Sequence, residues 1–172
     1  ALAPLEAKEF RQAAEQALEA AGLLSPAQGD WPRLLHLARG SVRRLLALAT
    51  GDGLKLAQRV STILENLPKV DWAAAHALAD ELAGAANEQR FEVFFDLLLD
   101  LSARLARAAA TGEGEPDEVA LARRLITEGR LASWAELWET VVREKAQALA
   151  LNLDRKALVL ETLSRLEGAS RR

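Results

Sequence analysis

The apolar residues of this chain recur three or four positions apart, in segments separated by glycine, proline or helix-capping side chains. This spacing places apolar side chains on one face of a helix. The longest such segment covers residues 88–110, and its expected apolar face consists of Phe91, Phe94, Leu98, Leu101, Leu105 and Ala108. Further apolar side chains surround this face, so we expect a central helix that other helices cover.

Shorter patterns before residue 50 predict three short helices, over residues 5–21, 31–39 and 42–49. Asp30 and Ser41 are suitable caps for the second and third helices. Their side chains can accept hydrogen bonds from the exposed amides of a first helical turn. The first fifty residues therefore form a small helical unit of their own.

Longer helices are predicted after residue 50: over residues 54–67, 72–83 and 88–110, from Pro116 onward, over 133–149, and from about 153 to 168. Asp71 and either Asn152 or Asp154 are their clearest caps. The segment Ser133–Glu136 matches a capping box, in which a serine and a glutamate satisfy each other's exposed amides. We expect this part of the chain to form a five- or six-helix bundle.

Composition supports helices throughout. Leucine and alanine, which lose little side-chain freedom in a helix, occur 33 and 35 times among 172 residues. Tyrosine is absent and only four phenylalanines and four tryptophans are present, whereas strands favour aromatic and β-branched residues. The predicted fold class is all-α.

Charge and missing residue types narrow the functional classes. The net charge of −3 does not favour non-specific binding to a phosphate backbone. The absence of cysteine excludes disulfides and zinc–thiolate sites and suits a reducing compartment. No apolar run is long enough for a membrane span. We expect a cytoplasmic protein, and because methionine is also absent we expect a segment of a longer one.

Residues that could carry catalysis are few. His36 and His76 are the only histidines, and neither has the carboxylate three positions earlier that a di-iron helical bundle uses. The segment Gly51–Lys55 lacks the Gly-Lys-Ser/Thr sequence of a phosphate-binding loop. The sequence therefore predicts no intrinsic enzyme activity, no cofactor and no metal ligands of its own.

Three carboxylates lie four residues apart along the central helix: Glu92, Asp96 and Asp100. Like charges at this spacing mildly destabilise a helix, which invites an explanation. The row can be a solvated face, can face a basic partner, or can bind a divalent metal. The last alternative corresponds to a metal-dependent helical enzyme, although no histidine or second acidic helix completes the site.

Trp134 and Trp138 are also four residues apart and share a face of their predicted helix. Core packing is one interpretation. The other is an anchor at a subunit interface, where tryptophan is enriched among the residues that contribute most to binding.

Four short segments carry a resemblance to a known family: Leu37–Leu48, Gly51–Leu54, Asn66–Pro68 and Ala148–Lys156. The first resembles the Gly-Ser/Asp-x-Arg stretch in the helical lid of clamp-loader AAA+ ATPases. Together the four segments resemble the delta-prime subunit family of bacterial DNA polymerase III. The similarity extends over nearly the whole chain.

This resemblance implies that residues 1–50 are a partial AAA+ lid and residues 51–172 a collar domain. Collar domains of this family join delta, delta-prime and gamma/tau subunits in a ring, which loads the sliding clamp onto primed DNA. The chain would then be a non-catalytic structural subunit that meets DNA only through the assembled complex and has no contact with a membrane. A stand-alone helical adaptor, unrelated to replication, is the alternative.

The resemblance also places Arg43 at the position of the lid arginine and Arg44 beside it. In this family the lid arginine can touch nucleotide, but delta-prime proteins often depart from that form, so no nucleotide contact is assigned to Arg43. From the residues alone, Ser41 caps a helix whose first turn carries two cations. Cations are unfavourable at that end of a helix, which indicates an anionic neighbour for Arg43 or Arg44. The pair therefore either faces solvent or contacts another domain or subunit, and Arg44 is a possible interface residue.

A collar domain needs two neighbours, so we expect two exposed apolar patches on this chain. The helix that bears Trp134 and Trp138 is one candidate. The last helix is the other, with an expected apolar stripe of Leu153, Ala157, Leu160 and Leu163 that Val159 and Leu166 widen.

Overall fold

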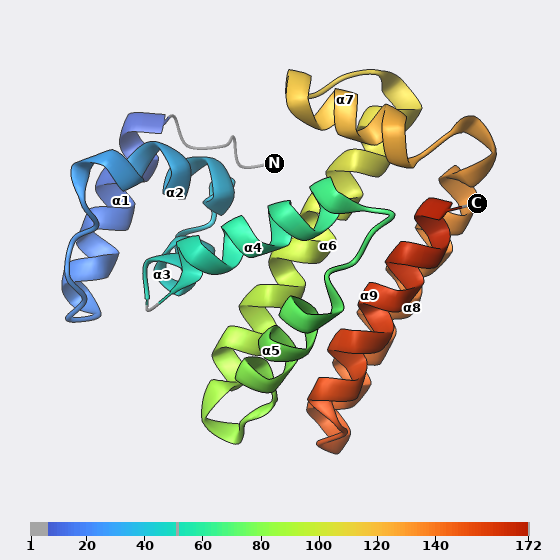
Figure 1. The fold of residues 1–172 in the computed structure, drawn as a ribbon. Helices are drawn as coiled ribbons and strands as arrows, with labels where there is room; N and C mark the ends of the chain where they lie inside the picture. The colour runs from blue at the N-terminus through green and yellow to red at the C-terminus, as the bar shows by residue number, and fades with distance from the viewer. Residues whose placement is uncertain (1–6, 51, 172) are drawn as a thin grey trace. The chain divides into compact units, whose positions relative to one another are not determined.

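The computed structural model describes residues 7–50 and 52–171, and over these ranges the chain forms nine α-helices, three short 3₁₀ turns and no strand. The all-α prediction is confirmed (Figure 1). The chain divides into two compact units, Ala1–Ala57 and Gln58–Arg172. The assignment of residues 1–50 to a lid and 51–172 to a collar stays a prediction, and two of its details, a first helix starting at residue 5 and a motif starting at Gly51, involve residues outside the described ranges.

The first unit contains three short helices, as predicted: α1 (Ala7–Ala20), α2 (Trp31–Ala38) and α3 (Val42–Ala49). Their apolar faces meet in one core of Phe10, Ala14, Leu18, Trp31, Ala38 and Leu45. The Arg11 guanidinium lies over the Trp31 ring, 4.8 Å from its centroid, where the cation is attracted to the face of the ring.

Ser41 caps α3 as predicted. Its backbone is extended, and its side-chain oxygen accepts a hydrogen bond from the Arg44 amide at 3.3 Å. The chain reaches this position through Arg39 and Gly40, both with positive φ. Asp30 precedes α2 but makes no capping hydrogen bond.

Gly53 opens α4 (Gly53–Asn66), a helix that begins in the first unit and continues into the second. A Cβ atom on this residue would lie 2.3 Å from the Leu48 carbonyl oxygen and 2.6 Å from the Leu48 Cα. These atoms belong to the backbone and cannot rotate away. Only glycine therefore allows α3 and α4 to approach each other this closely.

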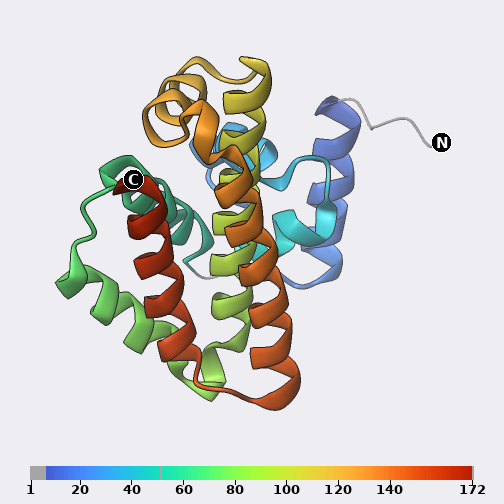
Figure 2. The ribbon, with the colours of Figure 1, turned by 90° about the vertical axis from the view of Figure 1, so that its right-hand side faces the viewer.

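The second unit is built around α6 (Glu88–Thr111), and α5 (Trp72–Ala83), α7 (Pro116–Leu125) and α8 (Leu131–Leu151) pack against it. The predicted apolar face of α6 is buried throughout. Phe95 packs against Phe91 and Phe94, with ring centroids 4.8 and 5.2 Å apart. α9 (Arg155–Arg171) completes the unit by packing on α5 and α8 (Figure 2).

Two predicted caps of this unit are confirmed and one is wrong. Asp71 accepts a hydrogen bond from the Ala74 amide at 3.0 Å, and Asp154 accepts one from the Ala157 amide at 3.0 Å. Ser133 caps nothing, because α8 already begins at Leu131. The Arg130 amide bonds to the Thr127 carbonyl oxygen at 2.8 Å, and this turn starts the helix earlier.

The predicted apolar stripe of α9 is confirmed at Val159, Leu163 and Leu166, which are buried, and wrong at Leu153 and Ala157, which are exposed. The remaining residues of the buried face are Arg155, Leu158, Thr162 and Ser170. The Thr162 hydroxyl donates to the Leu158 carbonyl oxygen at 2.8 Å, and the Ser170 hydroxyl donates to that of Leu166 at 2.7 Å. Because their hydroxyls are satisfied within the helix, these polar residues can face the core.

We predict that Gly53→Ala lowers the free energy of unfolding by about 1–3 kcal/mol, because the added methyl group forces the backbones of α3 and α4 apart. Gly168→Ala is the matched control. It adds the same atoms inside α9, where nothing lies within 4 Å, and should be neutral or stabilise by up to about 1 kcal/mol. Urea denaturation followed by circular dichroism measures both, and equal effects would contradict the close approach at Gly53.

Candidate interaction surface

Two carboxylates of the acidic row on α6 have basic partners within the second unit. Asp96 forms an ion pair with the Lys145 ammonium on α8. Asp100 pairs with Arg104, whose Nε also donates to Glu118 Oε1 on α7 at 2.9 Å. Glu92, at the start of the row, is half-buried. The row therefore connects α6 to its neighbours α7 and α8, and intrachain partners account for two of its three charges.

The metal-site interpretation of this row gains no support from the geometry. In residues 7–50 and 52–171 there is no group of three or more histidine, cysteine, aspartate or glutamate side chains that could hold a metal ion. His36 and His76 are both exposed, on α2 and α5.

The two tryptophans of α8 have different environments. Trp134 is 1% exposed and belongs to the core, and its indole Nε1 has no hydrogen-bond partner in the described structure. Trp138 is 37% exposed, and its Nε1 donates to the Leu99 carbonyl oxygen on α6 at 3.0 Å. Core packing thus describes Trp134, while Trp138 is held at the surface by a hydrogen bond.

Trp138 is part of an apolar stripe along α8. The exposed apolar residues that follow its three- and four-residue spacing are Ala135, Trp138, Val142 and Ala146. Trp138 contacts Leu99 of α6, and Lys145, which comes later in α8, contacts Asp96, which comes earlier in α6. The two helices are therefore antiparallel neighbours, as Figure 2 shows.

We refer to Asp96 and Leu99 of α6 together with Ala135, Trp138, Val142, Lys145 and Ala146 of α8 as the α6–α8 face. Sequence reasoning found Asp96 and Trp138 but did not select the other residues. The four-residue step from Trp138 to Val142 was the signal available for Val142. Nothing local indicates Lys145, because its partner Asp96 is distant in the chain.

The last helix does not supply a comparable surface. Its large apolar residues Val159, Leu163 and Leu166 are buried within the chain. Outside α8 and its C-terminal turn, where Leu151 and Leu153 are exposed, the only other large apolar side chain that is strongly exposed in the described ranges is Leu24. Of the two helices proposed as interface elements, α8 is the one with exposed large apolar side chains.

The segment Ala148–Lys156, which carries part of the family resemblance, forms the joint between α8 and α9. Asn152 ends α8 in the left-handed conformation, with φ of 50°. Arg155 is 7% exposed, pairs with Glu88 at the start of α6, and lies over the Phe91 ring at 5.5 Å from its centroid. Lys156 pairs with Asp80 of α5. This segment fixes α9 against α5 and α6.

At the other end of the chain, Arg43 and Arg44 lie in the first turn of α3. Arg43 is exposed and Arg44 is half-buried. The backbone amide of Arg44 is the group that Ser41 caps. Arg43, which the resemblance places at the lid-arginine position, is thus a surface residue of the first unit.

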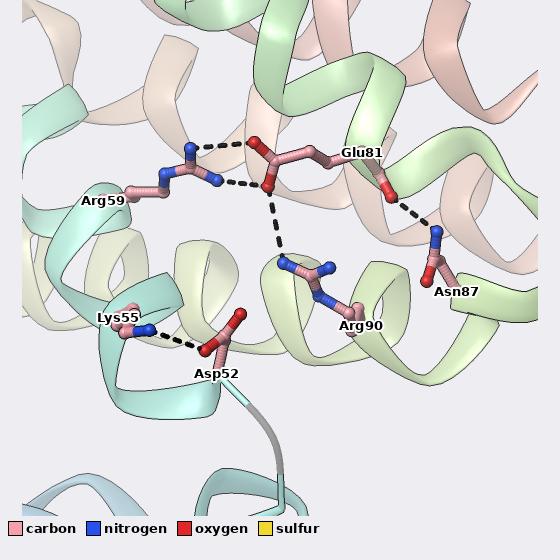
Figure 3. A network of polar contacts seen from close by, with 6 residues as sticks. All are labelled: Asp52, Lys55, Arg59, Glu81, Asn87 and Arg90. Carbon is pink, nitrogen blue, oxygen red and sulfur yellow. Dashed lines mark hydrogen bonds and ion pairs between the residues drawn. The ribbon is translucent and has the colours of Figure 1, made fainter.

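A polar network on α4, α5 and α6 was not predicted (Figure 3). Glu81 of α5 accepts hydrogen bonds from Arg59 of α4 at 2.6 and 2.9 Å and from Arg90 of α6 at 3.4 Å, and its carbonyl oxygen accepts one from the Asn87 side chain at 2.8 Å. Figure 3 also draws an ion pair of the first unit, between Lys55 and Asp52 at 3.0 Å. Arg59 and Glu81 are 22 residues apart, so no local pattern reveals this pair.

Two open cavities lie in the second unit. One, of about 470 Å³, lies between α4 and α5 and is lined by Arg59, Ile63, Lys69 and Leu78 among others. The other, of about 430 Å³, lies between α8 and α9 and includes Arg130 and Arg165. The pKa of Arg165 is raised above its ordinary value, mainly by its hydrogen bond to Glu144. Neither lining contains a histidine or a nucleophile–base pair.

No helix in the described part of the chain combines the length and apolarity needed to cross a membrane. Comparison with protein-family models, curated proteins and solved structures found no match to this chain.

We predict that Trp134→Ala and Trp138→Ala have very different effects on stability. Removing the buried Trp134 ring leaves a cavity and should cost about 3–5 kcal/mol. Removing the partly exposed Trp138 ring, with its single hydrogen bond, should cost about 1 kcal/mol. Trp134→Phe controls for ring volume and should be milder than Trp134→Ala. Urea denaturation measures all three, and equal losses at the two positions would contradict their assigned environments.

Proposed function

We propose that this chain is a non-catalytic assembly module of the bacterial DNA replication machinery, the lid and collar part of a delta-prime-type subunit of the DNA polymerase III clamp loader. In this role it associates with gamma/tau and delta subunits in the cytoplasm. It needs no cofactor or metal of its own, meets DNA only through the assembled complex, and makes no contact with a membrane. The finer assignment of Arg43 to the lid-arginine position belongs to the same proposal.

The observation that carries an assembly function is the exposure of Trp138 and Val142 on α8. The core of the second unit is complete without them, since α6 is already covered by α5, α7 and α8. Trp138 is 37% and Val142 36% exposed, and they lie one turn apart in a continuous apolar strip of α8. Contiguous apolar patches on a protein surface mark protein–protein contacts when they are large. Tryptophan in particular contributes strongly to binding energy at interfaces.

The segments that carry the resemblance support the specific partner assignment. Three of their residues serve the local fold: Ser41 caps α3, Asp154 caps α9, and Gly53 allows a close approach of two backbones. These segments therefore contain folding determinants that a related protein would share. The proposal of gamma/tau and delta as partners depends on this resemblance.

A stand-alone helical adaptor would use the same exposed side chains, so it differs from our proposal in its partner and not in its surface. A metal-dependent enzyme is less well supported, because Asp96 and Asp100 are engaged by Lys145 and Arg104.

We predict that the purified chain co-elutes in size-exclusion chromatography with collar fragments of bacterial gamma/tau and delta subunits. Proteins of the ring bury large surfaces, so the complex should persist at micromolar concentration. The matched negative control is an unrelated helical bundle of similar size and charge. Separate elution at concentrations where intact clamp loaders assemble would contradict the clamp-loader assignment and favour the adaptor.

A further inference from the structure

We infer that the α6–α8 face binds a helix of a partner protein whose apolar stripe is flanked by lysine or arginine side chains. The inference rests on the proposed assembly function and names the surface and the chemistry of the partner. The apolar strip, the charge and the rigidity of the α6–α8 face each contribute to this conclusion.

The apolar part of the face suits a helix. Ala135, Trp138, Val142 and Ala146 follow one another along α8 at three- and four-residue steps, so they form a continuous strip parallel to the helix axis. The two alanines leave room for another backbone to approach, and Trp138 and Val142 offer the contact area. An amphipathic helix lying along such a strip is a common recognition mode.

Carboxylates outnumber cations beside this strip. Asp96 lies on its α6 side with a side chain that is 57% exposed, and its partner Lys145 is only 16% exposed. Glu92 precedes Asp96 by one turn of α6, and on α8 the exposed Glu136 and Glu139 lie beside the strip together with one exposed cation, Arg143. Carboxylates remain in excess, so a partner with basic side chains beside its apolar stripe would be attracted, and an acidic partner repelled.

The face is also held rigid before binding. The Trp138 indole donates to the Leu99 carbonyl oxygen, and the Lys145 ammonium is paired with Asp96, so side chains of both helices are already fixed. Less conformational entropy is then lost when a partner binds. A second copy of this chain is a poor occupant, because it would bring the same excess of carboxylates to the contact.

The test uses two probes with the full chain, monitored by isothermal titration calorimetry. One is the gamma/tau collar fragment. The other is a synthetic amphipathic helical peptide with a leucine stripe flanked by lysines, compared with a peptide in which glutamates replace the lysines. We expect the lysine peptide and the collar fragment to bind, and the glutamate peptide not to bind.

The double variant Trp138→Ser with Val142→Ser should weaken binding of both probes at least tenfold. The double variant Asp96→Asn with Glu139→Gln should weaken it severalfold and reduce its dependence on salt. Leu151→Ser is the matched control: Leu151 is 68% exposed, but its spacing places it on a different side of α8, so this variant should bind as the unchanged chain does. Circular dichroism and thermal denaturation verify that each variant is folded.

The outcomes separate this inference from the proposed function. If the collar fragment does not bind but the lysine peptide binds in a Trp138-dependent way, the clamp-loader assignment fails and the surface assignment stands. If the collar fragment binds equally to the unchanged chain and to the Trp138/Val142 variant, the surface assignment is overturned. Concentration-dependent dimerisation that the same variant abolishes would also overturn it, in favour of a second copy.

Discussion

Burial of α6 is the constraint on which the second unit depends. This helix is apolar around most of its circumference, and Phe91, Phe94 and Phe95 are each shielded from solvent. Each buried aromatic side chain of this size contributes about 1.5–3 kcal/mol relative to exposure, so leaving one face of α6 open would be costly. Helices α5, α7 and α8 are placed where they cover it. The strip that contains Asp96 remains outside, where Asp96 pairs with Lys145 of α8 while its own side chain stays 57% exposed.

The same constraint explains why α8 has apolar residues left over. Trp134, Val141 and Ala148 satisfy the need to cover α6 and the adjoining core. Trp138 and Val142 lie at the edge of that contact and continue the apolar surface past it, where no helix of the described chain covers them completely. A helix that only had to cover α6 would carry polar residues at these positions. This excess is the basis of the interaction surface that we propose on α8.

Local signals predicted much of the fold and little of the tertiary detail. The apolar face of α6 and the caps at Ser41, Asp71 and Asp154 depend on neighbours in sequence, and these predictions are confirmed. The capping box at Ser133 was wrong because an earlier turn had already started the helix. The stripe of α9 was right at Val159, Leu163 and Leu166 but missed Thr162 and Ser170, which satisfy their hydroxyls within the helix and behave as core residues. The different environments of Trp134 and Trp138 depend on where α6 lies, which periodicity does not encode.

Arg155 connects the joint between α8 and α9 to the core around α6. A buried guanidinium is expensive unless it is paired, and here it pairs with Glu88 at the start of α6 and lies over Phe91, a central residue of the core. These contacts set the position of the first turn of α9 relative to α6. Only the short segment from Asn152 to Asp154 separates α8 from α9. The contacts of Arg155 therefore also constrain the end of α8. The register that brings Trp138 to Leu99 and Lys145 to Asp96 is thus held at one end by Arg155. The joint at Ala148–Lys156 and the α6–α8 face are therefore parts of one arrangement, and a change in the first would displace the second.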